Sequence, residues 1–181
     1  MKLQGFRKMI IVLMGMVFLN VLSAHAETTA EEYFKSGLAY AKQGNWFQAI
    51  SSYTNAIKIK PDLTAAYFNR GNAYFNGGNY DGAILDYTKT SQLKPNFIEA
   101  YDNRAAAYIN KGNNDQAILD CSKVIALNPD FSDAYNNRGT AYYYKKEYDK
   151  AWADIHTAEK LGASIDPPFL KDLQKASGRD K

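Results

Sequence analysis

The stretch that decides the fold of this protein runs from residue 67 to residue 95. It opens with Tyr67-Phe68-Asn69-Arg70-Gly71-Asn72-Ala73-Tyr74, has a Gly-Gly-Asn turn at 77–79 and ends on Pro95. Apolar and small residues recur in it at intervals of three and four, which is typical of two amphipathic helices. Proline lacks the N–H that a helix needs, so Pro95 ends the second helix. The stretch therefore predicts a helical hairpin.

The same pattern returns along the chain every 34 residues. Tyrosine, alanine and proline keep their places in the series Tyr33, Tyr67, Tyr101, Tyr135; Tyr40, Tyr74, Tyr108, Tyr142; Ala49, Ala83, Ala117, Ala151; and Pro61, Pro95, Pro129. A period of this length indicates stacked units that cannot bury their apolar faces alone. The copies are predicted at 30–63, 64–97, 98–131 and 132–165.

This hairpin resembles the tetratricopeptide repeat. The resemblance is carried by Tyr67, Gly71, Tyr74, Ala83, Tyr87 and Pro95, which follow the order of that family's signature. It implies an all-α fold, a right-handed superhelical solenoid of four helix-turn-helix hairpins. The first helices of the hairpins would line a concave groove.

The fourth copy departs from the pattern at its end, where Ala163 replaces the expected proline. We expect Gly162 to end the helix, Asp166 to act as an N-cap and Pro167 to take the first helical position after it. The segment 166–177 then resembles the capping helix that covers the last repeat of such an array.

The first 26 residues have the three parts of a secretory signal peptide. Three basic residues precede the 14-residue apolar run Met9–Leu22, and Ala24-His25-Ala26 follows as a small-x-small exit. The run is short for a membrane-spanning helix, which needs about 20 residues. Cleavage is predicted between Ala26 and Glu27, which leaves no membrane span and a periplasmic or secreted protein. An uncleaved N-terminal anchor is the alternative.

Charge and composition argue against several function classes. The first 26 residues hold three of the 22 basic residues and none of the 19 acidic ones, so the remaining chain is neutral and no nucleic-acid partner is expected. Cys121 and His156 are the only cysteine and histidine after residue 26. We therefore expect no enzyme, no metal site and no cofactor. Cys121 should be a buried small hydrophobe.

Two charged positions change together from copy to copy. Arginine at the seventh position and aspartate at the twenty-third give three predicted structural ion pairs: Arg70 with Asp86, Arg104 with Asp120, and Arg138 with Asp154. The first copy has Ser36 and Ser52 there instead. Because an unpaired buried charge is costly, the joint change favours pairs that bridge helices. The alternative is that both residues lie at solvent-exposed edges, where ion pairs contribute little.

The resemblance also places residues on the concave face. The candidate partner-binding residues are Phe34, Phe68, Asn69, Asn72, Asn76, Asn103, Asn110, Asn136, Asn137 and Tyr144. Asparagine at the sixth position of three copies offers a donor and an acceptor to the backbone of an extended peptide. We expect these asparagines to be exposed. The alternative is a polar surface residue that duplication has repeated.

The sequence thus predicts an adaptor or scaffold that binds an extended segment of a partner protein. A variant of the family that binds the C-termini of cytosolic chaperones uses lysines where this chain has Phe34 and Glu99, so a chaperone tail is not expected. The alternative function is a structural or self-associating subunit of a cell-envelope assembly without a peptide ligand.

Overall fold

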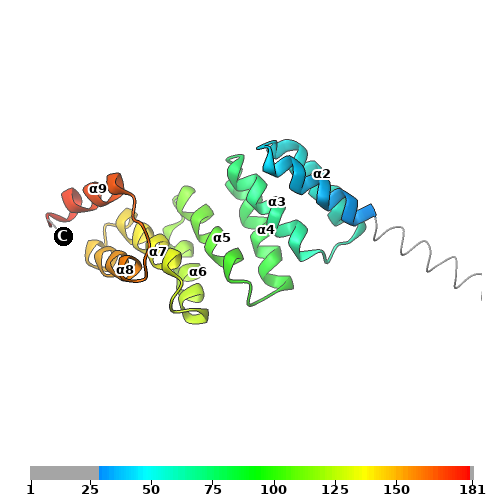
Figure 1. Cartoon of the computed structure of the whole chain (residues 1–181). Coiled ribbons are helices and arrows are strands. Elements are labelled where there is room, and N and C mark those ends of the chain that lie inside the picture. Colours follow the sequence, from blue (N-terminus) through cyan, green and yellow to red (C-terminus); the bar gives the residue numbers. More distant parts are fainter. Residues whose placement is uncertain (1–28, 180–181) are drawn as a thin grey trace, which may run out of the picture. The chain divides into compact units, whose positions relative to one another are not determined.

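The computed structural model describes residues 29–179, and every regular element in this part of the chain is a helix. A helix covers residues 29–42. The others are α2 (Trp46–Ile59), α3 (Thr64–Asn76), α4 (Tyr80–Leu93), α5 (Ile98–Asn110), α6 (Asn114–Leu127), α7 (Ser132–Tyr144), α8 (Tyr148–Lys160) and α9 (Pro167–Ser177) (Figure 1). The expected all-α class is confirmed. The chain divides into two compact units, with the boundary in the sequence between Ala66 and Tyr67.

The first unit is built around the hairpin of the helix over residues 29–42 and α2. Tyr53 on α2 is fully buried, and its ring packs against Phe34 with centroids 5.7 Å apart. Gly37 is the residue that lets the two helices approach, because a side chain there would overlap the Tyr53 ring.

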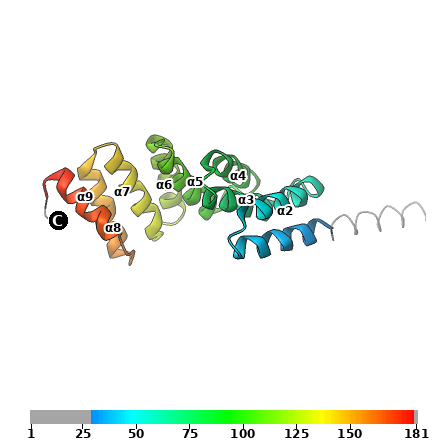
Figure 2. The ribbon, with the colours of Figure 1, turned by 90° about the horizontal axis from the view of Figure 1, so that it is seen from above.

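The second unit is an array in which each helix packs on the next. The series α4, α5, α6, α7, α8 and α9 is packed in chain order, and the first helices α5 and α7 of successive hairpins also contact each other (Figures 1 and 2). This arrangement is that of tandem helical hairpins. It leaves the first helices on one side of the unit and the second helices on the other.

The core of the second unit repeats with the sequence period. Tyr87, Cys121 and Ile155 occupy equivalent places on α4, α6 and α8 and are almost completely buried. Gly71 on α3 faces the ring of Tyr87, and a Cβ at Gly71 would lie 2.8 Å from its Cε1 atom. The small residue is therefore required by close packing.

The turns inside the hairpins share one backbone conformation. A residue with positive φ occurs in each, at Gly44 (73°), Gly78 (77°), Gly112 (76°) and Lys146 (63°). Glycine adopts this left-handed conformation without steric cost, whereas a residue with a Cβ does not. Lys146 is therefore the strained member of the series.

Helix α9 covers the end of the second unit. Its Leu173 is completely buried and belongs to the same cluster as Trp152 and Ile155 of α8. The indole Nε1 of Trp152 donates to Ser177 Oγ at 3.0 Å. Gly162 has a positive φ of 91° just after α8, and α9 begins at Pro167 as expected. The expectation for Asp166 is wrong in one respect, because its side chain makes no capping hydrogen bond.

The predicted signal peptide and its cleavage site fall outside the described residues. Over residues 29–179, no helix combines the length and the apolar character needed to cross a membrane.

Candidate functional site

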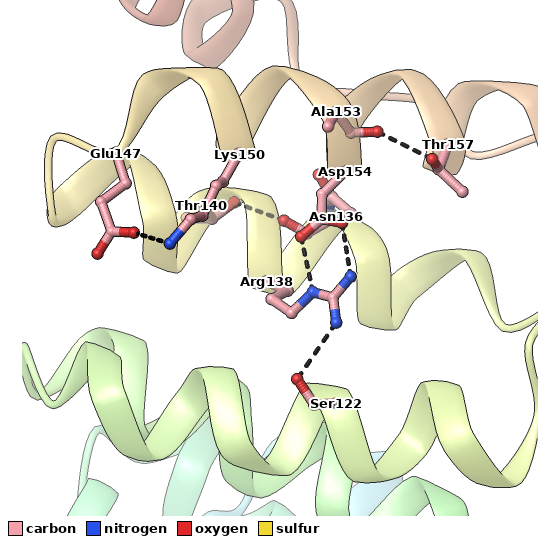
Figure 3. Close-up of polar contacts among 9 residues, drawn as sticks. All are labelled: Ser122, Asn136, Arg138, Thr140, Glu147, Lys150, Ala153, Asp154 and Thr157. Atoms are coloured by element: carbon pink, nitrogen blue, oxygen red, sulfur yellow. Dashed lines mark hydrogen bonds and ion pairs between the residues drawn. The ribbon is translucent and has the colours of Figure 1, made fainter.

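Three ion pairs join the two helices of the hairpins in the second unit. In each, arginine Nε and Nη2 donate to the two oxygens of one aspartate at 2.7–2.8 Å, as in Arg138 with Asp154 (Figure 3). The other two pairs are Arg70 with Asp86 and Arg104 with Asp120. All three aspartates are buried. The structure thus brings together the partners that the sequence paired.

The guanidinium groups also reach the preceding hairpin. Arg138 Nη1 on α7 donates to Ser122 Oγ on α6 at 3.2 Å (Figure 3), and Arg104 Nη1 on α5 donates to Thr88 Oγ1 on α4 at 2.9 Å. The hydrogen bonds with Asp154 raise the pKa of Arg138 and outweigh the opposing effect of burial. These ion pairs hold successive repeats in register. Each arginine and aspartate charge is already paired within the scaffold.

A pocket of about 300 Å³ opens between α3 and α5. It is lined by Asn72, Phe75, Asn76, Tyr87, Asn103 and Ala106. Three of these residues are asparagines that the sequence placed on the concave face. Phe75 and Ala106 give the pocket an apolar wall beside the amides.

Hydrogen bonds fix the orientation of the asparagines around this pocket. Asn72 Oδ1 accepts from the hydroxyl of Tyr87 at 2.7 Å and from Nδ2 of Asn103 at 3.0 Å. Asn76 Nδ2 donates to the backbone carbonyl of Asn72 at 2.9 Å. Beyond these bonds, the amides around the pocket keep further capacity, because each Nδ2 carries two N–H donors and each Oδ1 accepts up to two hydrogen bonds. The pocket is therefore lined by amide donors as well as amide acceptors.

The sixth-position asparagines differ from the exposed series expected from the sequence. Asn103 and Asn137 are half-buried, and each donates to a side chain of the preceding repeat, to Asn72 and to Asp102 respectively. The difference arises because successive first helices pack closely enough for a short amide to span them. Asn69 is also half-buried and lines neither this pocket nor the next one.

The remaining predicted residues fall into three groups. Phe34 and Phe68 are half-buried, and Phe68 packs on the rings of Tyr87 and Phe97, with centroids 5.9 and 4.8 Å away. These two rings are part of the packing. Asn110 and Tyr144 instead line a second, more open pocket of about 450 Å³. Asn136 is half-buried and lines neither pocket.

Asp102 is the residue whose importance the sequence did not reveal. It lies on α5, is 8% exposed and accepts a hydrogen bond from Asn137 Nδ2 at 2.9 Å. Burial raises its pKa to about 6, and the nearby charges of Asp133 and Glu99 add to the rise, whereas the bond from Asn137 opposes it. Its place on the concave face was predictable, but its burial depends on how α7 packs on α5.

The described residues offer no metal centre. Within residues 29–179, no group of three or more histidine, cysteine, aspartate or glutamate side chains could hold a metal ion. His156, the histidine of this range, packs against Trp152 with ring centroids 5.3 Å apart and lines neither pocket.

Several solved structures have a fold similar to that of this chain. The crystal structure of MamA matches with a TM-score of 0.71 and 27% identity, over 80% of this chain and 84% of that one. The first TPR of Spaghetti (RPAP3), bound to the HSP90 peptide SRMEEVD, matches with a TM-score of 0.62 and 26% identity, over 65% and 93%. The Arabidopsis OM64 TPR domain matches with a TM-score of 0.59 and 29% identity, over 63% and 96%.

Family models give the most direct assignment. A search of curated proteins returned no match. The model described as TPR repeat matches residues 37–78 and 107–146, and the model described as tetratricopeptide repeat matches residues 64–97. Together these matches span more than half of the chain and overlap all four predicted copies. The chain belongs to the tetratricopeptide repeat family.

Proposed function

We propose that this protein is a non-catalytic adaptor that binds an extended segment of a partner protein along the first helices of its second unit. The observation that carries the proposal is the pocket between α3 and α5, where the amides of Asn72, Asn76 and Asn103 have donors and acceptors to spare. An extended backbone offers N–H and C=O groups in alternation and matches such a set.

The size of the pocket favours one side chain of a peptide over a whole small molecule. Its volume of about 300 Å³ is at the lower limit for small-molecule sites. Phe75 and Ala106 would contact an apolar side chain while the asparagines bind the adjoining backbone. The Spaghetti structure, which has a peptide bound to the same fold, supports this class of ligand.

Export is the second part of the proposal and is supported by the sequence alone. The basic start, the apolar run and the Ala24-His25-Ala26 exit favour a periplasmic or secreted protein with Glu27 as its first residue. Mass spectrometry of the protein from the extracytoplasmic fraction tests this. An intact Met1 start in the membrane fraction would support the anchored alternative.

Self-association is a second candidate function, favoured by the surface of the first unit. Tyr33 and Tyr40 are 39% and 38% exposed, whereas their counterparts in later copies, such as Tyr101 and Tyr108, are half-buried. Phe47 is exposed as well. Sedimentation over a range of protein concentrations distinguishes a monomeric adaptor from a self-associating subunit.

The adaptor proposal is tested by partner capture with paired variants. Asn72→Ala with Asn76→Ala removes two pocket amides, and Leu119→Ala removes an exposed side chain on α6, outside both pockets. We expect the pocket variant to lose the partner that the wild type and the Leu119 variant retain. Equal capture by all three proteins, each shown to be folded, would reject this face as the binding site.

A further inference from the structure

Asp102 is a buried carboxylate without a counter-charge. Asp86, Asp120 and Asp154 are buried to a similar extent, but each forms two hydrogen bonds with an arginine. Asp102 instead accepts one bond, from the neutral amide of Asn137, and no other donor among residues 29–179 reaches it. The charges that act on it, those of Asp133 and Glu99, are both negative. Burying a charge in this way is costly.

The scaffold does not require a carboxylate at this position. In the first two copies the same position holds Phe34 and Phe68, which pack on Tyr53 and Tyr87 with ring centroids 5.7 and 5.9 Å apart. In the third copy both large rings are replaced, by Asp102 and Cys121. An aromatic pair fills this place in the first two copies, and the fourth has the uncharged Asn136 and Ile155, so the charge is particular to the third copy.

Asp102 lies between two first helices, α5 and α7, and is flanked there by exposed acidic residues. Glu99 on α5 and Asp133 on α7 are exposed, and Asn137 on α7 holds the carboxylate between these two helices. The arginines of the neighbouring ion pairs, Arg104 and Arg138, are engaged by Asp120 and Asp154. The site is therefore anionic, partly pre-formed and without a cation from the described residues.

We propose that Asp102, with Glu99 and Asp133 around it, receives an arginine or lysine side chain of the bound segment. This inference rests on the proposed function and specifies the chemistry of the partner. A cation at this place would supply the missing counter-charge, and a buried pair with a fixed carboxylate is a strong source of specificity.

The position of the site also sets the spacing within the partner segment. The pocket of Asn72 and Asn103 lies between α3 and α5, and Asp102 with Asn137 lies between α5 and α7, one hairpin further on. Neighbouring packed helices are about 10 Å apart, and an extended chain advances about 3.3 Å per residue. The basic residue should therefore follow or precede the pocket residue by about three positions.

Nuclear magnetic resonance with the chain from Glu27 to Lys181 tests this inference. The probe is an acetylated, amidated alanine peptide with one leucine and, three positions away, one arginine. The control peptide carries citrulline, which has the shape of arginine without its charge. We expect the arginine peptide to shift the Asn137 side-chain amide signal and to bind about tenfold more tightly at pH 7 than the citrulline peptide.

The tighter binding of the arginine peptide, relative to the citrulline peptide, should disappear in Asp102→Asn. It should also decrease between pH 7 and pH 5, as Asp102 becomes protonated. Asp130→Asn, an exposed acidic residue between α6 and α7, serves as the matched control and should retain it. Equal binding of both peptides, with shifts at Asn72 and Asn76, would overturn the inference and leave the adaptor proposal standing. A lack of shifts with either peptide at millimolar concentration would count against both.

Discussion

Arg104 and Asp120 are joined by two parallel hydrogen bonds of 2.7 Å, from Nε to Oδ2 and from Nη2 to Oδ1. The same guanidinium donates to Thr88 at 2.9 Å, so one side chain of α5 fixes both α6 and α4. The planar guanidinium matches the carboxylate in this geometry, which lysine could not reproduce. The pair thus holds successive hairpins in register.

This geometry predicts strong coupling in a double-mutant cycle. Removal of one partner leaves a buried charge unpaired, so Arg104→Leu and Asp120→Leu should each lower the free energy of unfolding by about 3–5 kcal/mol. The double variant should recover much of that loss. Urea denaturation measures all three. As a control, the exposed pair of Lys145 and Asp115 should show little coupling. Small, additive effects at Arg104 and Asp120 would contradict the account.

The turn at Lys146 offers a stabilising substitution. The φ of 63° at Lys146 is strained for a residue with a Cβ, whereas the equivalent turn in the preceding hairpin has Gly112 at 76°. Lys146→Gly should therefore raise the free energy of unfolding by about 1 kcal/mol. The reciprocal change Gly112→Lys should lower it by a similar amount. A destabilised glycine variant would mean that the lysine side chain makes a compensating contact.

Asp102 predicts an unusual pH dependence of stability. Burial raises its pKa to about 6 in the folded protein, above the value of 3.8 for an unperturbed carboxyl. The folded protein therefore binds a proton at Asp102 more tightly than the unfolded chain does. As a result, the free energy of unfolding decreases as the pH rises from about 4 to above 6. Relative to Asp102→Asn, the wild type should lose on the order of 2–3 kcal/mol over this range. A constant difference between the two proteins in pH-dependent urea titrations would contradict this, and Asp130→Asn should show no such trend.

Cys121 should react slowly with thiol reagents in the folded protein. It is completely buried, and burial raises the pKa of its thiol, so that little thiolate is present near neutral pH. Labelling with a chromogenic disulfide should be slow in buffer and rapid in denaturant. Rapid labelling of the native protein would mean that this part of the core opens readily.

Much of the fold could be predicted because equivalent positions of the four repeats can be compared with one another within the one sequence. The 34-residue spacing of Tyr67, Tyr101 and Tyr135 indicated stacked hairpins, and the joint change of Arg104 with Asp120 predicted their contact. Both are properties of sequence position and charge. They do not depend on the exact packing distance between helices.

The details of the site could not be predicted in this way. The bond from Asn103 to Asn72 and the burial of Asp102 depend on how closely one hairpin lies against the next. The left-handed turn at Lys146 was hidden because glycine, the usual signal, is missing there. A single sequence gives the face on which such residues lie but not which neighbours their side chains reach.

Site-specific photo-crosslinking tests the central claim most directly. Benzoylphenylalanine would replace Asn76, an exposed residue of the pocket, or Leu119, which is 61% exposed on α6 and lines neither pocket. We predict that the probe at Asn76 crosslinks to one short continuous segment of one partner protein, identified by mass spectrometry, and that the probe at Leu119 does not. Crosslinking of that partner from Leu119 but not from Asn76 would contradict the account.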